Sequence, residues 1–109
     1  MSGLSDRERA VEAKYERDTE LNFKVQVRRN KFVGEWAAEL MGLEGMDSRA
    51  YVQSLIDMDV EGKDDADVIA KIDIDLQSKG IQQSKHRIER RFSEALAKAR
   101  SELMSEPEA

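Results

Sequence analysis

A run of alternating acidic side chains is the part of the sequence that most resembles a chemical site. Asp57, Asp59, Glu61 and Gly62 match the first half of a calcium-binding EF-hand loop, in which a glycine stands at the sixth position. The twelfth position requires a bidentate glutamate, but this chain has Val68 there. We therefore expect no metal site, and we interpret the run as a solvated acidic connection between two helices.

The residue types needed for common enzyme chemistry are scarce. The chain has no cysteine, which excludes disulfides, thiolate zinc sites and cysteine nucleophiles, and His86 is its only histidine. No serine or threonine lies in a recognisable nucleophile motif. We predict no catalytic residue, no resident cofactor and no enzymatic activity, and we favour a structural or capping role for His86.

Two clusters of basic residues could bind anions. They could hold the phosphate groups of a nucleotide, meet an acidic partner, or form salt bridges with the acidic middle of the chain, and the last interpretation is favoured. Without a glycine-rich phosphate loop, a nucleotide site would be weak and built from side chains. The candidate residues are Arg28, Arg29 and Lys31 in the first cluster and Arg87, Arg90 and Arg91 in the second.

The charge distribution bears on the class of partner. The net charge is −5, with +4 over residues 21–33 and −8 over residues 34–80. A nucleic-acid-binding protein normally carries a basic face, so this balance favours a protein partner. No apolar run approaches the ~20 residues that span a bilayer, so we expect a cytoplasmic protein without direct membrane insertion.

Helix signals dominate the chain. Ser5 and Glu8 form a capping-box pattern, which predicts a helix from near Asp6 to Met41 that ends at the glycines of residues 42–45. Residues 21–27 alternate apolar and polar side chains, a strand pattern, but no turn or partner strand accompanies them. We predict helix there, and a kink or a close packing contact at Gly34.

Three further helices follow. Asp47 is the predicted N-cap of the second, Asp64 or Asp65 caps the third, and Gly80 ends the third. The last helix has an apolar stripe at three- and four-residue spacings, formed by Ile88, Phe92, Ala95, Leu96, Ala99 and Leu103. The expected fold class is all-α, a four-helix bundle with a long first helix and a flexible N-terminal segment.

The leading segment differs from the rest of the chain in composition. Between Asp6 and Glu20 the apolar side chains are only Ala10, Val11, Ala13 and Tyr15. Such a segment buries little surface, so we expect it to become ordered when a partner supplies apolar surface. Tyr15 is then either a contact for the partner or a loose contact with the bundle. The predicted organisation is a flexible segment at 1–19, a helical bundle at 20–105 and a disordered tail at 106–109.

Four stretches of the sequence together resemble a known family. They are residues 6–15, residues 28–42 with a tryptophan after Arg-Arg-Asn-Lys and a glycine, residues 75–81, and residues 84–92. In this register the chain resembles the zeta subunit of bacterial F-type ATP synthases over nearly its whole length. One departure is Glu35, where we expect an apolar residue after the glycine.

The resemblance implies a function as well as a fold. It implies a four-helix regulatory subunit that binds the catalytic head of the F-type ATP synthase, formed by its alpha, beta and gamma subunits, peripheral to the inner membrane. The N-terminal segment would block ATP hydrolysis, and weak binding of ATP or ADP is also implied. The alternative is a cytoplasmic helical module that senses adenine nucleotides. The candidate inhibitory contacts are Arg7, Glu8, Arg9, Glu12, Lys14 and Tyr15.

Overall fold

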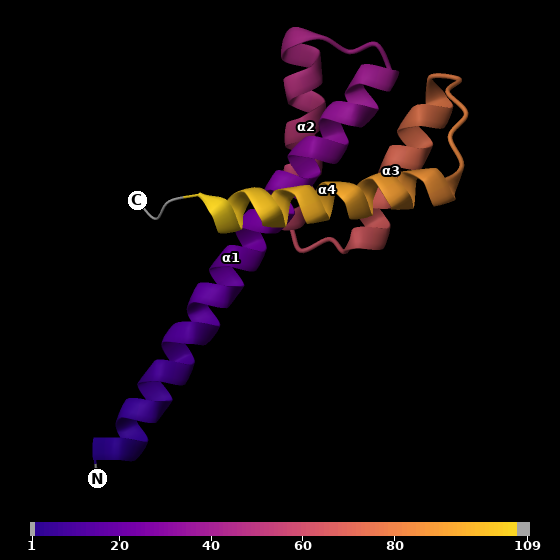
Figure 1. Ribbon diagram of the computed structural model, residues 1–109. Coiled ribbons are helices and arrows are strands. Elements are labelled where there is room, and N and C mark those ends of the chain that lie inside the picture. The colour runs from indigo at the N-terminus through magenta and orange to yellow at the C-terminus, as the bar shows by residue number, and fades with distance from the viewer. Residues whose placement is uncertain (1, 107–109) are drawn as a thin grey trace.

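The structure of the protein is all-helical. The computed structural model describes the backbone of residues 2–106 and the side chains of residues 19–106. Its four helices are α1 (Ser2–Leu40), α2 (Gly45–Val60), α3 (Asp65–Ser78) and α4 (Lys85–Ser105), and residues 2–106 contain no strand (Figure 1). The predicted all-α, four-helix class with a long first helix is confirmed. Residues 21–27 lie inside α1, so the prediction of helix there is confirmed too.

Several helix ends form as the sequence predicts. As predicted, Asp64 caps α3, in a reciprocal capping box with Asp67. The cap of α4, which was not predicted, is Ser84, whose hydroxyl accepts from the Arg87 amide. Gly42 and Gly80 adopt positive φ angles of 74° and 73° just after α1 and α3. This left-handed conformation, which glycine adopts without steric cost, turns the chain out of each helix.

Two predicted helix starts are wrong. The N-cap of α2 is Glu44, which has extended backbone angles and no side-chain cap bond, and Asp47 lies in the first turn instead. The Asp47 and Ser48 amides already donate to the Glu44 carbonyl, so helical bonding begins three residues earlier than predicted. α1 begins at Ser2 rather than near Asp6, and the side chains of the predicted capping box lie outside the described residues.

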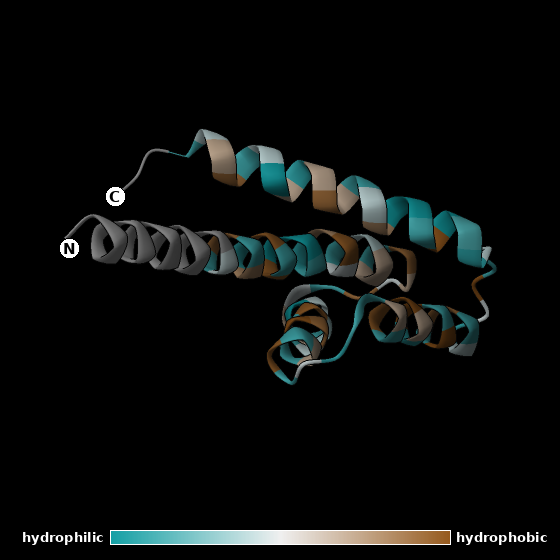
Figure 2. Cartoon of the chain, turned by 90° about the horizontal axis from the view of Figure 1, so that it is seen from below, coloured by the Kyte–Doolittle hydropathy of each residue, from teal (hydrophilic) through white to brown (hydrophobic). Residues whose placement is uncertain are grey.

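The C-terminal half of α1 is the centre of the bundle. α2 and α4 both pack against it, and α3 packs mainly against α4 (Figure 1). The contacts of Asn30 with Asp59 and of Gly34 with Val52 show that α2 runs in the opposite sense to α1. Those of Arg28 with Glu102 and of Trp36 with Arg91 show the same for α4, which crosses α1 obliquely (Figure 1). Apolar residues recur between hydrophilic ones along α4 (Figure 2), at the three- and four-residue spacings of an amphipathic helix. The core consists of Val33, Ala37, Leu55, Val68, Ile72, Leu76, Ile88, Phe92 and Ala95.

Gly34 lies where α1 and α2 pack closely together. A Cβ atom at this position would lie 3.2 Å from Leu55 Cδ1 and 3.3 Å from the Val52 Cα. The second of these atoms belongs to the backbone and cannot rotate away. Of the two predicted possibilities, the close packing contact is the one observed.

Arg29 links all four helices from the interior. Its Nη2 lies 3.6 Å from Asp59 of α2, its Nη1 lies 3.2 Å from Asp65 of α3, and its guanidinium stacks 4.1 Å from the Phe92 ring centroid of α4. Asn30 completes the network by accepting from Arg29 Nε and donating to the Leu55 carbonyl and to Asp59. These polar contacts fix the positions of the helices relative to one another.

Candidate functional site

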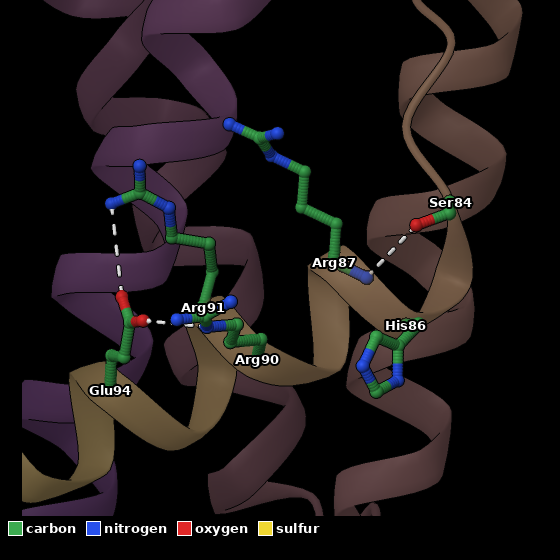
Figure 3. Close-up of a pocket in the computed structure, with 6 residues that line it drawn as sticks. All are labelled: Ser84, His86, Arg87, Arg90, Arg91 and Glu94. Atoms are coloured by element: carbon green, nitrogen blue, oxygen red, sulfur yellow. Dashed lines mark hydrogen bonds and ion pairs between the residues drawn. The ribbon is translucent and has the colours of Figure 1, made fainter.

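The second basic cluster forms a cavity at the start of α4. The cavity has a volume of about 450 Å³ and faces solvent (Figure 3). Because residues three and four apart share one face of a helix, the first turns of α4 bring the arginines together. The lining residues are Ser84, His86, Arg87, Arg90, Arg91 and Glu94.

Positive charge prevails in this cavity. Glu94 is its only carboxylate and lies 3.3 Å from Arg90 Nε and 4.0 Å from Arg91 Nη1. The Arg91 guanidinium also lies 5.6 Å from the ring centroid of Trp36 on α1. Three guanidinium groups beside one carboxylate can hold an anion through side chains alone. His86 is exposed and points away from the Arg87 guanidinium, and the capping group here is Ser84 (Figure 3).

The first basic cluster is divided by burial. Arg28 lies at the surface and pairs with Glu102 and Glu106 near the end of α4, whereas Arg29 has a side chain only 2% exposed. The favoured interpretation, salt bridges to the acidic middle of the chain, is confirmed for Arg29 through its contacts with Asp59 and Asp65. Arg29 therefore cannot contact a ligand at the surface. Within this cluster, Arg28 and Lys31 remain as candidate anion-binding residues.

The two basic clusters do not form one site. Arg91 meets Trp36 near the end of α1, whereas Arg28 meets Glu102 at the other end of the contact between α1 and α4. At 1.5 Å per residue, Arg87 and Glu102 are about 20 Å apart along α4. Any anion would therefore meet one cluster or the other.

The comparisons with known proteins decide the family. The sequence matches the family described as ATPase inhibitor subunit zeta over residues 1–102. The chain belongs to this family. A search of curated proteins finds no match. Among residues 2–106, none of the helices of this zeta-family chain combines the length and the apolarity needed to cross a membrane.

The acidic run at 57–62 is only partly a loop in this zeta-family chain, because α2 continues to Val60. Asp57 and Asp59 lie in the last turn of α2, and the Asp59 side chain is only 5% exposed. The interpretation of the run as a solvated connection is therefore wrong for Asp59, which Arg29 and Asn30 bind in the interior. Asp57 is solvated as predicted but belongs to α2, and Glu61 and Gly62 lie in the exposed turn that follows the helix. Among the described side chains, no three histidine or acidic residues gather around a metal position.

Burial changes the protonation chemistry of Asp59. Loss of solvent contact raises the pKa of this carboxyl, the nearby Arg29 opposes the rise, and Asp65 adds to it. The spacing of the acidic run gives no sign of this environment, because the partner Arg29 lies 30 residues earlier in the chain.

The predicted inhibitory contacts all lie in the first half of α1. Residues 7–15 belong to the continuous helix that begins at Ser2. Their side chains, like all those of residues 1–18, lie outside the part of the chain whose side chains the structure describes. The roles of Arg7, Glu8, Arg9, Glu12, Lys14 and Tyr15 stay predictions.

Proposed function

We propose that the chain is a regulatory subunit that binds the catalytic head of the F-type ATP synthase and blocks ATP hydrolysis through residues 1–19. The match to the ATPase inhibitor subunit zeta family over residues 1–102 carries the proposal. The bundle at 20–105 is the body that presents this segment. The proposed contacts in the head are with its alpha, beta and gamma subunits.

The burial pattern along α1 supports separate roles for the N-terminal segment and the bundle. In residues 19–24 no side chain is buried, and the first buried side chain among the described residues is Val25. Every member of the hydrophobic core cluster lies between Val33 and Ala95. The start of α1 from residue 19 to residue 24 thus adds length to the helix but little to the core, which supports a partner-binding role for the segment before it.

The proposed mechanism is a mechanical block. Hydrolysis in a rotary ATPase requires each catalytic interface to close and open in turn. A helix lodged in one interface opposes this cycle, and the bundle attached to it prevents the helix from passing through. The proposed contacts are Arg7, Glu8, Arg9, Glu12, Lys14 and Tyr15, of which Tyr15 supplies the largest apolar surface.

Deletion of residues 1–19 tests the proposal. The truncated chain is expected to keep its helical circular dichroism spectrum and cooperative melting, and to lose inhibition of ATP hydrolysis by the isolated catalytic head. A chain with residues 1–19 shuffled controls for length and composition, and should also fail to inhibit. Full inhibition by either variant, or loss of folding on deletion, would contradict the proposal.

A second function, weak binding of ATP or ADP, is favoured by the cavity at the start of α4. Its three arginines can hold phosphate groups, and Trp36 lies beside Arg91. Titration of the isotope-labelled chain with ATP to millimolar concentration is expected to shift the NMR signals of residues 84–94, and Arg87→Ala should weaken the shifts. Absence of any shift in the wild type would remove this function.

A further inference from the structure

A second concave surface lies where α1 leaves the bundle. It is an open groove of about 530 Å³ between α1 and the end of α4, and α2 also contributes to its lining. Phe23 and Val27, one helical turn apart on α1, line the groove together with Ile56 of α2 and Leu103 of α4. Three helices therefore combine to form a mainly apolar surface, which we call the base groove.

Phe23 is the most prominent residue of the base groove. It is 46% exposed, although aromatic side chains dominate the energetics of cores and interfaces. Its partner Val27 is half-buried, so the groove has a floor to receive a side chain beside the ring. An exposed aromatic residue next to an apolar hollow is typical of an interface hot spot.

The rim of the base groove is positively charged. Among the described residues that line it, Lys24, Arg28 and Lys31 are basic and Glu106 is acidic. Arg28 pairs with Glu102 and with Glu106, so Glu106 is already engaged. Lys24 has only an exposed pair with Glu20 at 3.5 Å, and Lys31 makes no ion pair within residues 19–106. Two lysines thus remain to attract acidic groups, on a chain whose net charge is −5.

We propose that the base groove docks an amphipathic helix of the ATPase, one whose apolar stripe is flanked by acidic residues. This proposal rests on the proposed function. Apolar side chains three, four and seven residues apart on such a helix fill the hollow beside Phe23, and its acidic residues pair with Lys24 and Lys31. The groove is then a second contact, separate from the inhibitory segment.

The position of the groove on α1 identifies the occupant as part of the same ATPase. Phe23 lies four residues after the proposed inhibitory segment, about 6 Å along the helix axis. A partner that holds residues 1–19 therefore also reaches the base groove. Two linked contacts bind more tightly than either alone, because the second forms at a high effective concentration.

A second copy of this chain fits the base groove less well. A two-fold dimer places the same surface on both sides, so Lys24 and Lys31 of one copy would face those of the other. Like charges directly opposed are unfavourable. An acidic helix of the ATPase meets no such repulsion.

Substitutions in the full chain test the groove independently of inhibition. Phe23→Ala removes the aromatic side chain of the base groove. The double substitution Lys24→Glu, Lys31→Glu reverses the charge of its rim. Ile74→Ala, at a residue 63% exposed on α3, and Lys63→Glu, at an exposed loop residue, are matched controls. Each chain is immobilised, and its affinity for the isolated catalytic head is measured by surface plasmon resonance, alongside the inhibition at saturating concentration.

We expect Phe23→Ala to weaken binding about tenfold while leaving maximal inhibition unchanged. The charge reversal should weaken binding most at low salt, and the controls should match the wild type. If both groove variants are folded by circular dichroism and bind with unchanged affinity, the proposal that the base groove docks a helix is wrong. The proposed function is left intact by that result. A wild-type chain that binds without inhibiting would refute the inhibitory function, while the affinities still test the groove. Absence of binding, or a dimer that Phe23→Ala dissolves in sedimentation experiments, would overturn the groove proposal.

Discussion

The two described parts of α1 form one continuous helix but have different surroundings. Residues 19–24 bury no side chain, whereas residues 25–40 include the buried Val25, Arg29, Asn30 and Val33. Helix formation therefore does not distinguish the two parts, since both are helical. The difference lies in what each side chain can contact, and it divides a single element into a bundle component and a length of helix available to a partner.

The largest effect on stability is expected from removing Arg29, the buried arginine of α1. Arg29→Ala leaves the buried Asp59 without its cationic partner and removes the contact with Phe92. Loss of one member of a buried ion pair destabilises by about 3–5 kcal/mol, which urea unfolding can measure. Arg28→Ala, at the neighbouring surface position, is the matched control and should change the free energy of unfolding far less. Equal effects of the two substitutions would contradict the burial of the Arg29 ion pairs.

A smaller loss of stability is expected at Gly34. The added methyl group of Gly34→Ala would lie 3.3 Å from the Val52 Cα, so α1 and α2 must move apart. Overpacking of this kind costs about 1–3 kcal/mol, and the higher helix propensity of alanine recovers up to about 1 kcal/mol. Thermal melting should show a net destabilisation. A gain in stability would mean that the helices are less closely packed than described.

The pH dependence of stability offers a test of Asp59. Because burial raises the pKa of Asp59 above its ordinary value of 3.8, the folded protein holds this proton more tightly than the unfolded chain does. The contribution of Asp59 to the free energy of unfolding therefore falls as pH rises from its ordinary pKa through the raised one. Asp59→Asn removes this contribution, so the stability of the variant relative to the wild type should rise with pH across that window. Urea unfolding of both proteins in parallel measures the difference, and parallel pH profiles would contradict the burial of Asp59.

The smallest effect is expected in the exposed part of α1. Glu20→Ala removes the exposed pair with Lys24, whose members are one helical turn apart. Such pairs contribute only about 0.3–0.5 kcal/mol. A loss above 1 kcal/mol, measured by urea unfolding, would show that the start of the described helix contributes to the bundle after all.

Local signals in the sequence predicted most of the fold. The capping residue Asp64, the turn glycines at 42 and 80, and the periodic apolar positions of α4 act through contacts within a few residues, so they can be recognised in the sequence itself. Trp36 also packs against the core as its position on an apolar face indicates.

The parts that the sequence did not predict depend on contacts between distant residues. Asp59 looks like an exposed loop ligand until Arg29 and Asn30 are placed beside it by helix packing. The base groove likewise combines Phe23, Ile56 and Leu103 from three helices, and no local pattern unites them. The start of α2 was misplaced because its N-cap Glu44 makes no side-chain cap bond and so leaves no signature in the sequence.

We propose that the segment before the buried part of α1 engages the ATPase while the core stays as it is. Amide hydrogen exchange of the full chain, alone and bound to the isolated catalytic head, is the decisive measurement. Residues 1–19 are expected to gain strong protection on binding, and the core of α2 and α3 is expected to exchange at the same rate in both states. Protection gained only within the bundle, with residues 1–19 exchanging equally fast in both states, would contradict the proposal.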